Sequence, residues 1–351
     1  MKLLIAGDSH IKPSILESHL RDTLHPISKD LEIELIEWEW DDSYYNAQPI
    51  PNEPGLKEYA GSPDKLSSLV RGVDILVVHM APVTSSVLEA GDRLKIVGCC
   101  RGGPVNVNVK AATLRKIPVL FTPGRNADTV ADYAIGMILA ESRSIARAHA
   151  DLKRGVWRGI DLMNYDNAGF ELAGKTLGIV GIGNIGLKVA ERAKAFGMEI
   201  LAYDPYVAKE KIEAAGLKSV DLATLFSQSD FVTIHARATP ETKGMIDKKV
   251  LSLMKETSYL INTARGDLVD EEALYEILKT RKIAGAGIDV FQIEPLHFDS
   301  PILTLDNVTV TPHIAGASKE AVHRAAQIIA DDVGRVLIGK KPLHCANPEV
   351  L

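Results

Sequence analysis

Three short segments late in the chain carry side chains that could hold an anion or move a proton. Arg265 stands in the segment INTARGD, Glu294 in GIDVFQIEP, and His313 in TPHIAG. A guanidinium can grip a carboxylate through two parallel hydrogen bonds, and a histidine can act as a general acid or base. Taken singly, each has an ordinary explanation, namely a surface ion pair, a loop acid and a structural histidine. Their setting must therefore decide between the two interpretations.

The chain alternates short apolar runs with helical patterns, which is typical of parallel sheets covered by helices. Helical periodicity follows Asn126, and a second helical pattern runs from a predicted N-cap at Ser318 to Gly339. The apolar runs predict strands at residues 3–6, 32–36, 75–79, 95–98, 119–122, 176–180, 199–203, 230–234, 258–261, 287–290 and 308–311. The three polar segments follow strands of the second set, and ligands of such sheets gather at the carboxyl ends of the strands.

A glycine motif lies at the start of this second set of strands. Residues 181–186 read GIGNIG, which matches G-x-G-x-x-G between a predicted strand and a predicted helix. Gly181 would permit the tight turn, Gly183 would let the backbone approach a pyrophosphate, and Gly186 would let the helix pack close to the sheet. The helix N-terminus would then offer its N–H groups to the phosphates. The alternative is a glycine turn that binds nothing.

An acidic residue ends the following predicted strand. Asp204 lies 18 residues after Gly186 (204 − 186), close to the spacing of about 20 expected of a ribose-binding acid. Its carboxylate can accept hydrogen bonds from both ribose hydroxyls and would repel a 2′-phosphate. Pro205 and Tyr206 follow it, with no Arg or Lys. The sequence therefore predicts NAD as the cofactor instead of NADP.

A dinucleotide site and the three polar segments together fit one reaction. Hydride would move between a nicotinamide and a carbon bearing a hydroxyl group. His313 would handle the hydroxyl proton, and Arg265 would hold a carboxylate of the substrate. Glu294, paired with the imidazole, is expected to fix its orientation and favour its protonated form.

On these motifs the sequence resembles the D-isomer-specific 2-hydroxyacid dehydrogenases over nearly its whole length, through residues 180–186, 262–270, 287–295 and 312–316. The resemblance implies that Arg265, Glu294 and His313 are catalytic, that Asp289 contacts the nicotinamide amide, and that no metal takes part. The residues that it implies for the cofactor are Gly181, Gly183, Asn184, Ile185, Gly186, Asp204, His235, Ala236, Thr263, Ala264, Asp289 and Gly316. Those that it implies for the substrate are Arg101, Gly102, Gly103 and Arg265.

The same resemblance implies the domain organisation. The expected fold is α/β, with a Rossmann-type NAD-binding domain, residues 125–316, inserted into a flavodoxin-like discontinuous substrate domain, residues 1–124 and 317–351. The two crossings, near residues 122–128 and 316–318, would act as a hinge. Members of this family are usually dimers through the cofactor domain, so we expect a homodimer. We also expect no C-terminal regulatory domain of the kind found on some phosphoglycerate dehydrogenases.

The substrate side departs from the family pattern. Residues 101–104 read RGGP, where the family usually has an Arg followed by spaced glycines, and Met80 stands in an atypical first loop. Arg101, Arg125 and Arg237 would suit a phosphorylated or dicarboxylic acid, and structural pairing is an equal alternative.

We therefore predict an enzyme that interconverts a D-2-hydroxy acid and its 2-keto acid. One alternative is a D-3-phosphoglycerate dehydrogenase of serine synthesis, and another is an NAD(H)-sensing binding protein similar to the corepressor branch of the family. Oxidation of NADH with a panel of 2-keto acids would separate these functions.

Composition sets the remaining limits. The 351 residues are 46% apolar and 25% charged, with a formal net charge of −6, which predicts a globular protein with no nucleic-acid or membrane partner. The early Asp8 argues against a signal peptide. The three cysteines, Cys99, Cys100 and Cys345, form no framework and favour reduced thiols in the cytoplasm. The proline-rich stretch 38–63 is expected to be a loop insertion.

Overall fold

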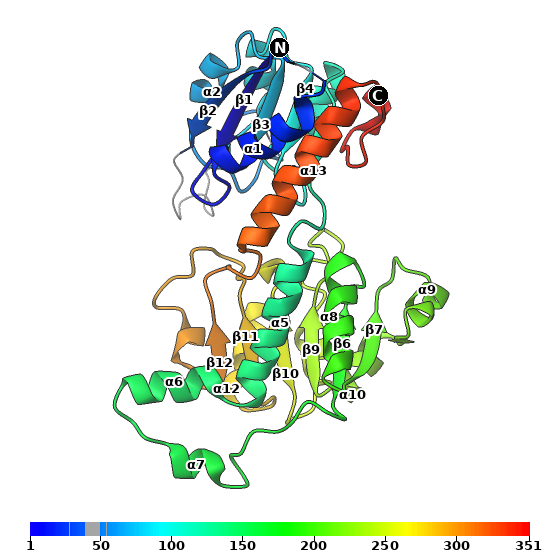
Figure 1. Cartoon of the computed structure of the whole chain (residues 1–351). Helices are drawn as coiled ribbons and strands as arrows, with labels where there is room; N and C mark the ends of the chain where they lie inside the picture. The colour runs from blue at the N-terminus through cyan, green and yellow to red at the C-terminus, as the bar shows by residue number, and fades with distance from the viewer. Residues whose placement is uncertain (28, 39–49, 54) are drawn as a thin grey trace. The chain divides into compact units, whose positions relative to one another are not determined.

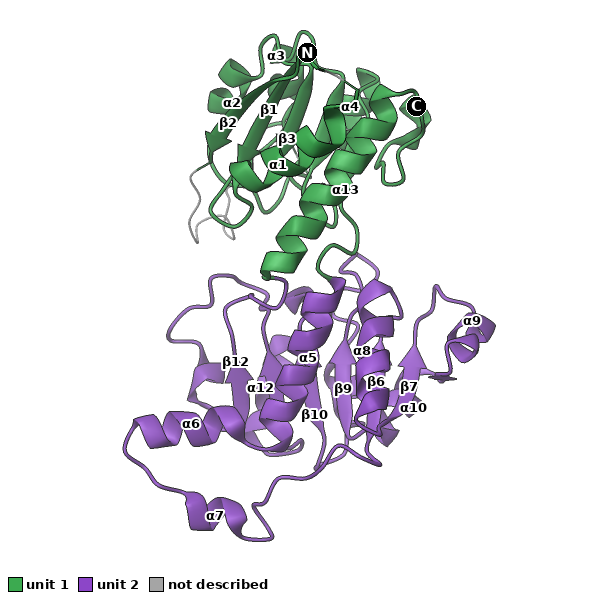
Figure 2. Cartoon of the chain, viewed as in Figure 1, with its two compact units in different colours: residues 1–126, 317–351 green, residues 127–316 purple. Residues whose placement is uncertain are grey.

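The computed structural model describes residues 1–27, 29–38, 50–53 and 55–351 (Figure 1). The described chain divides into two compact units. Unit 1 comprises Met1–Asn126 and Ala317–Leu351, and unit 2 comprises Ala127–Gly316 (Figure 2). Each unit is built on its own parallel sheet with helices on both faces, which confirms the predicted α/β fold class.

Unit 1 contains a five-stranded parallel sheet in the order β2-β1-β3-β4-β5. Its strands are β1 (Lys2–Gly7), β2 (Glu32–Glu37), β3 (Ile75–Val78), β4 (Ile96–Cys99) and β5 (Val119–Phe121). The central strands are short and wholly buried, as expected of a sheet covered on both faces. The strand order reverses between β1 and β3, which are neighbours in the sheet.

Among the described residues of unit 1, five helices cover this sheet. On one face lie α1 (Pro13–Leu24) and α13 (Lys319–Leu337), which pack with β1 and β3 side chains in one apolar cluster. The opposite face is covered by α2 (Pro63–Leu69), α3 (Ser85–Ala90) and α4 (Val109–Leu114). The predicted N-cap of the last helix is confirmed, because the Ser318 hydroxyl accepts a hydrogen bond from the backbone N–H of Ala321 at 3.0 Å.

Unit 2 contains a seven-stranded parallel sheet in the order β12-β11-β10-β9-β6-β7-β8. Counted from β6, this is the order 3-2-1-4-5-6 of the Rossmann fold with one strand added at the edge, and the order reverses between β6 and β9. The strands are β6 (Thr176–Val180), β7 (Glu199–Tyr203), β8 (Lys218–Ser219), β9 (Phe231–Ile234), β10 (Tyr259–Asn262), β11 (Gly285–Ile288) and β12 (Val308–Val310).

Two helices, α5 (Ala127–Ser142) and α8 (Asn184–Ala195), lie side by side on one face of this sheet (Figure 1). On the other face pack α10 (Leu222–Gln228), α11 (Lys248–Leu251) and α12 (Glu271–Lys279). The short helix α9 (Lys209–Ala214) follows β7, while α6 (Ile145–Lys153) and α7 (Gly159–Met163) form an arm after α5. Short 3-10 turns complete the chain at Gly266–Leu268, Pro301–Thr304 and Pro348–Val350.

The structure corrects the sequence prediction at three places. Strand β11 begins at Gly285, two residues before the predicted 287–290, because Gly and Ala carry no strand signal of their own. The edge strand β8 is only two residues long and gave no pattern to detect. The polar stretch after residue 151 contains α7. Much of the predicted insertion at 38–63 lies outside the described residues.

Candidate active site

The glycine loop after β6 has the geometry that a dinucleotide needs. Gly181 has φ of +96°, and a Cβ there would lie 2.6 Å from the backbone N of Ala236, so only glycine fits. A Cβ on Gly186 would lie 2.1 Å from the Gly181 carbonyl oxygen, which shows how closely α8 approaches the loop. At Gly183 a Cβ would meet nothing within 4 Å, so the backbone faces open space. Helix α8 begins there with no side-chain cap, which suits a pyrophosphate.

Asp204 holds this loop from the end of β7. Its Oδ2 accepts a hydrogen bond from the backbone N–H of Ile182 at 2.8 Å, and its Oδ1 accepts one from that of Tyr206 at 2.9 Å. The side chain is half-buried. Because each carboxylate oxygen can accept more than one hydrogen bond, the contacts in the structure leave room for the ribose hydroxyls.

Two polar side chains with unsatisfied atoms stand at the ends of the neighbouring strands β9 and β10. His235 pairs its Nε2 with the Thr233 hydroxyl at 3.0 Å, and burial lowers the pKa of His235 to about 3, so the ring is neutral. Within the described chain, His235 Nδ1 and the Thr263 hydroxyl are buried without a hydrogen-bond partner. Such atoms suit a ligand with a polar ring substituent, and a nicotinamide amide has one. The residues present therefore fit NAD.

Arg265 follows β10 in a loop that the Asn262 side chain shapes. The Asn262 Oδ1 accepts from the backbone N–H of Ala264 at 3.1 Å, and its Nδ2 donates to the Arg265 carbonyl at 3.1 Å. The Arg265 side chain is exposed, and its Nη1 donates to the Ala264 carbonyl at 2.8 Å. A Cβ on Gly266 would lie 2.0 Å from the carbonyl carbon of Phe291. This glycine therefore lets the Arg265 loop contact the loop that carries Glu294.

Glu294 and His313 form a hydrogen-bonded pair after β11 and β12. The His313 Nδ1 lies 2.7 Å from the Glu294 Oε2, and the Glu294 Oε1 accepts from the backbone N–H of Phe291 at 2.8 Å. The two side chains keep 23% and 15% of their surface exposed. Because the carboxylate accepts, Nδ1 carries a proton, and Nε2 is the ring nitrogen left for chemistry. The structure thus brings together two of the three predicted catalytic side chains, with the third on the adjoining loop.

Asp289 fixes the loop on which His313 stands. The buried carboxylate accepts hydrogen bonds from the Thr311 hydroxyl at 2.6 Å and from the backbone N–H groups of Ile314 and Ala315 at 3.0 and 2.8 Å. The His313 backbone has φ of +53°, a conformation uncommon for residues other than glycine. We infer that these hydrogen bonds hold that conformation. The predicted contact of Asp289 with the nicotinamide amide stays a prediction.

The predicted substrate residues of the first domain lie in unit 1, after β4. The Arg101 Nη1 donates to the Glu58 carbonyl at 2.8 Å, and its Nη2 bonds the Glu58 carboxylate. A Cβ added at Gly102 or Gly103 would meet no atom within 4 Å.

Across the described residues no cluster of three or more His, Cys, Asp or Glu is placed to hold a metal ion. No helix among them is long and apolar enough to cross a membrane.

Sequence reasoning missed the residues that shape the loops. The Asn262 side chain and Gly266 shape the Arg265 loop, and the Gln292 side chain donates to the Val269 carbonyl at 2.8 Å. An Asn at the end of a strand, here followed by Thr-Ala-Arg-Gly, is typical of a side-chain turn, and that signal could have identified Asn262. The packing of Gly266 against Phe291 joins loops 25 residues apart (291 − 266) and leaves no local signal.

Comparison with known proteins decides the family. Residues 135–315 match the model of the D-isomer specific 2-hydroxyacid dehydrogenase, NAD binding domain. The chain belongs to this family. Its cofactor is NAD, which the matched domain binds. The hydroxypyruvate reductase of Thermotoga maritima is 43% identical over 78% of this chain and 88% of the relative.

Three other similar proteins carry names different from that of the Thermotoga relative. The D-3-phosphoglycerate dehydrogenase of Methanocaldococcus jannaschii is 41% identical over 88% of this chain but only 58% of the relative. Another D-3-phosphoglycerate dehydrogenase, from Archaeoglobus fulgidus, is covered over 51% of its length, so the chain spans about half the length of these relatives. The solved structure of D-lactate dehydrogenase from Escherichia coli matches with a TM-score of 0.74 at 26% identity, over 99% of this chain and 100% of that one.

Proposed function

We propose that the chain is an NAD-dependent oxidoreductase that interconverts a D-2-hydroxy acid and its 2-keto acid. The observation that carries the proposal is the His313–Glu294 pair, 2.7 Å apart, on the sheet edge that also carries the glycine loop and Arg265. An acid–base group, a carboxylate-binding group and a dinucleotide cradle are the three parts that this reaction needs.

Arg265, His313 and Glu294 each have a separate role in the proposed reaction. Bound NADH supplies the hydride that reduces the ketone carbon. The Arg265 guanidinium holds the substrate carboxylate through two parallel hydrogen bonds and so orients the ketone. His313 donates the proton on Nε2 to the ketone oxygen, and in the reverse direction the same nitrogen accepts the hydroxyl proton. Glu294 keeps the Nδ1 proton in place and stabilises the imidazolium that donates.

The test is oxidation of NADH with hydroxypyruvate, glyoxylate, pyruvate and 3-phosphohydroxypyruvate. We expect turnover with at least one of them, and a preference for NADH over NADPH because Asp204 would repel a 2′-phosphate. Arg265→Lys should raise KM by about tenfold to a hundredfold without changing NADH affinity, because the two-pronged grip is lost. The matched control is Arg281→Lys, an exposed arginine paired with Asp306 on the surface. Tight NADH binding with no turnover on any substrate would favour the binding-protein alternative.

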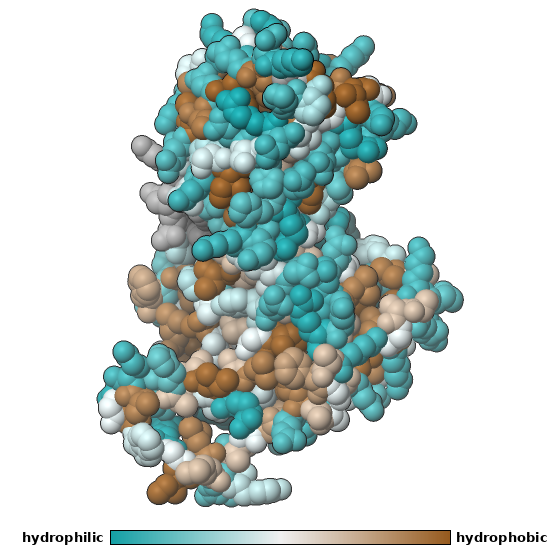
Figure 3. Space-filling view, viewed as in Figure 1, coloured by the Kyte–Doolittle hydropathy of each residue, from teal (hydrophilic) through white to brown (hydrophobic). Residues whose placement is uncertain are grey.

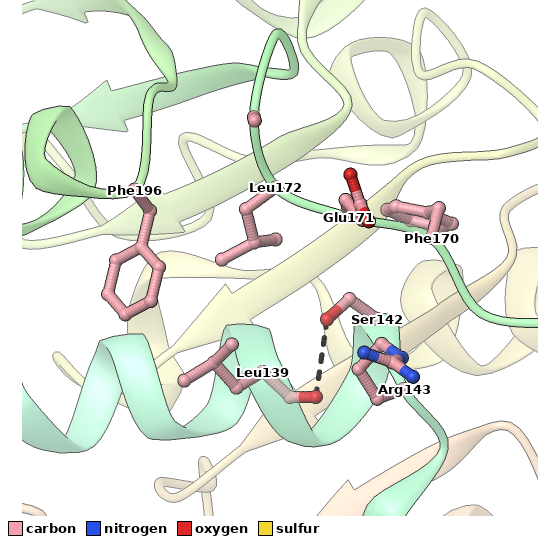
Figure 4. Close-up of a pocket in the computed structure, with 8 residues that line it drawn as sticks. Leu139, Ser142, Arg143, Phe170, Glu171, Leu172 and Phe196 are labelled. Carbon is pink, nitrogen blue, oxygen red and sulfur yellow. Dashed lines mark hydrogen bonds between the residues drawn. The ribbon is translucent and has the colours of Figure 1, made fainter.

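We also propose that unit 2 forms a homodimer through its arm, residues 143–170. The arm carries large apolar side chains that are mostly exposed, among them Trp157, Ile160 and Met163, and apolar groups gather on it in Figure 3. At its base, Leu139, Leu172 and Phe196 line a hollow of about 290 Å³ (Figure 4). A two-fold pair of copies could bury the arm of each chain on the other, which is why we choose a second copy as the partner.

Size-exclusion chromatography with light-scattering detection tests whether the chain is a dimer. The natural chain should elute at twice its mass, and the double variant Trp157→Asp, Ile160→Asp should elute as a monomer. Leu114→Asp, an equally exposed apolar residue in unit 1, should remain a dimer. A natural chain that elutes as a monomer would exclude the proposal.

A reducing compartment, the cytoplasm, is our proposal for the location. The three cysteines are free, and burial raises the pKa of the Cys99 thiol to about 11, which keeps it protonated and inert. Cell fractionation with an antibody to the chain would test it.

A further inference from the structure

The carboxyl edge of the unit 1 sheet holds a second cluster of polar groups, which the proposed reaction does not use. Asp8 follows β1, His79 follows β3, and Thr122 and Arg125 follow β5. The strand order of this sheet reverses between β1 and β3, the place where open parallel sheets bind ligands. Arg125 was also one of the arginines that the sequence offered for a phosphorylated or dicarboxylic acid.

The first part of the cluster is a buried acceptor. His79 Nδ1 lies 2.6 Å from the Asp8 Oδ2, and Asp8 also accepts from the backbone N–H groups of His10 and Ile11 at 3.0 and 2.9 Å. Burial lowers the pKa of His79 to about 4, so at neutral pH the ring has one proton, on Nδ1. Nε2 is then a bare acceptor, and it is buried without a partner in the described part of the chain.

The second part is a pair of buried donors. The Nε and Nη1 of Arg125 and the hydroxyl of Thr122 are buried, and no acceptor for them lies in the described chain. Asp8 attracts Arg125, but no carboxylate of a described residue lies within ion-pair distance of its guanidinium. The neighbouring Arg101 is occupied by Glu58. Because a buried guanidinium without a counter-ion is costly, this position favours an anionic ligand.

We propose that Arg125, Thr122 and His79 bind a phosphate group. The guanidinium and the hydroxyl donate to its anionic oxygens, while a P–OH group donates to His79 Nε2. A phosphate can carry that proton near neutral pH, whereas sulfate and carboxylates cannot. The oxygens of those anions would therefore face the lone pair of His79 Nε2 with no proton between them. The half-buried ring of His10, centred 5.4 Å from that of His79, closes the cluster.

The charged and titratable groups around the site are consistent with this assignment. Electrostatic interactions connect His79 with Asp8, Arg101 and Arg125, and the two arginines oppose protonation of His79. His10 interacts in the same way with Asp8 and Arg125. Cys99 ends β4 and Cys100 follows it. Burial raises the pKa of both thiols, so neither adds a negative charge. Burial, with a smaller contribution from the two arginines, thus keeps His79 as an acceptor until the ligand brings its own proton.

Calorimetric titration of the whole chain with inorganic phosphate and with sulfate at pH 7 tests the proposal. We expect phosphate to bind at least about tenfold more tightly than sulfate, since sulfate lacks the donor. Thr122→Val should weaken phosphate about tenfold and leave the thermal midpoint unchanged, because the hydroxyl has no partner to lose. Equal affinity for the two anions, or no binding of phosphate, would overturn the proposal.

Arg125→Met separates binding from a structural role. It should abolish phosphate binding and leave the midpoint in phosphate-free buffer equal or higher, because an unpartnered buried charge is removed. The matched control is Arg71→Met, an exposed arginine just before β3 at the other end of the sheet, which should bind phosphate normally. A large fall in the midpoint of Arg125→Met, with phosphate still bound, would show that Arg125 is structural.

The phosphate could be free or part of the substrate, and only the second case rests on the proposed function. If it belongs to the substrate, Thr122→Val should change the ratio of the KM values for 3-phosphohydroxypyruvate and hydroxypyruvate by about tenfold. An unchanged ratio, with inorganic phosphate still bound by the natural chain, assigns the site to free phosphate. If no 2-keto acid is reduced, the proposed function fails, and the phosphate titration still decides whether the phosphate site exists.

Discussion

Each unit of the molecule has a histidine hydrogen-bonded to a carboxylate at the carboxyl edge of its sheet. In unit 1, His79 Nδ1 lies 2.6 Å from Asp8, and in unit 2, His313 Nδ1 lies 2.7 Å from Glu294. The bonding is alike, but the surroundings differ. The side chains of the first pair are 1% and 0% exposed, whereas those of the second are 23% and 15% exposed.

The difference teaches that burial, more than pairing, decides what such a histidine can do. In unit 1, burial lowers the pKa of His79 to about 4, so the ring stays neutral and its bare nitrogen can only accept. In unit 2, both side chains of the pair keep part of their surface exposed, so a ligand can reach the ring. We therefore expect the partly exposed pair to control turnover and the buried pair to control stability and ligand binding.

The largest expected effect comes from His313→Gln. Removing the proton donor should lower kcat by about a thousandfold, within the range for general acid catalysis. NADH affinity and the thermal midpoint should change little, because the ring is partly exposed and Gln replaces it with a polar side chain. Steady-state kinetics with a 2-keto acid and fluorescence titration with NADH would check this. A kcat reduced less than tenfold would remove His313 from the proposed role.

The corresponding change in unit 1 should act on stability. His79→Ala leaves the Asp8 carboxylate buried without its partner and should lower the free energy of unfolding by about 3 kcal/mol. His79→Asn keeps an N–H group near Asp8 and should recover part of that loss. Urea denaturation of the three proteins measures it. Equal stability of all three would mean that the buried pair adds nothing to the fold.

Because of the buried pair, acid should lower the free energy of unfolding within a defined pH window. His79 is neutral in the folded unit and has an ordinary pKa of 6.5 once unfolded, against about 4 when folded. Between these values the unfolded chain binds more protons, so stability falls as the pH falls from 6.5 to 4. The gap corresponds to roughly 3 kcal/mol, and His235 in unit 2 adds a loss of the same sign. Denaturation at a series of pH values should show a shallower slope for His79→Asn.

The smallest effect is expected from Glu294→Gln. Gln keeps the shape but not the charge, so the imidazolium loses a stabilising neighbour. The upper limb of the pH profile for ketone reduction should move down by about one pH unit. A profile that keeps its upper limb in place would show that Glu294 only positions the ring.

Much of this architecture could be predicted from the sequence because it follows local patterns. The strand–glycine–helix–acid pattern around Gly181 and Asp204 predicted the dinucleotide fold, and its geometry depends on backbone turns that glycine alone allows. The order of the polar segments after successive strands predicted that Glu294 and His313 would meet. What escaped prediction depends on distant packing. The contact of Gly266 with Phe291 and the burial of His79 each join segments far apart in the chain.

The central claim is that His313 transfers a proton while hydride passes to a 2-keto acid. The most direct measurement is the product formed from deuterated NADH labelled at the transferring position, analysed by mass spectrometry and chiral chromatography. We predict deuterium on C2 of a D-2-hydroxy acid, formed about a thousandfold more slowly with His313→Gln. Tight NADH binding with no deuterated product from any acid of the panel, or a product of L configuration, would contradict it.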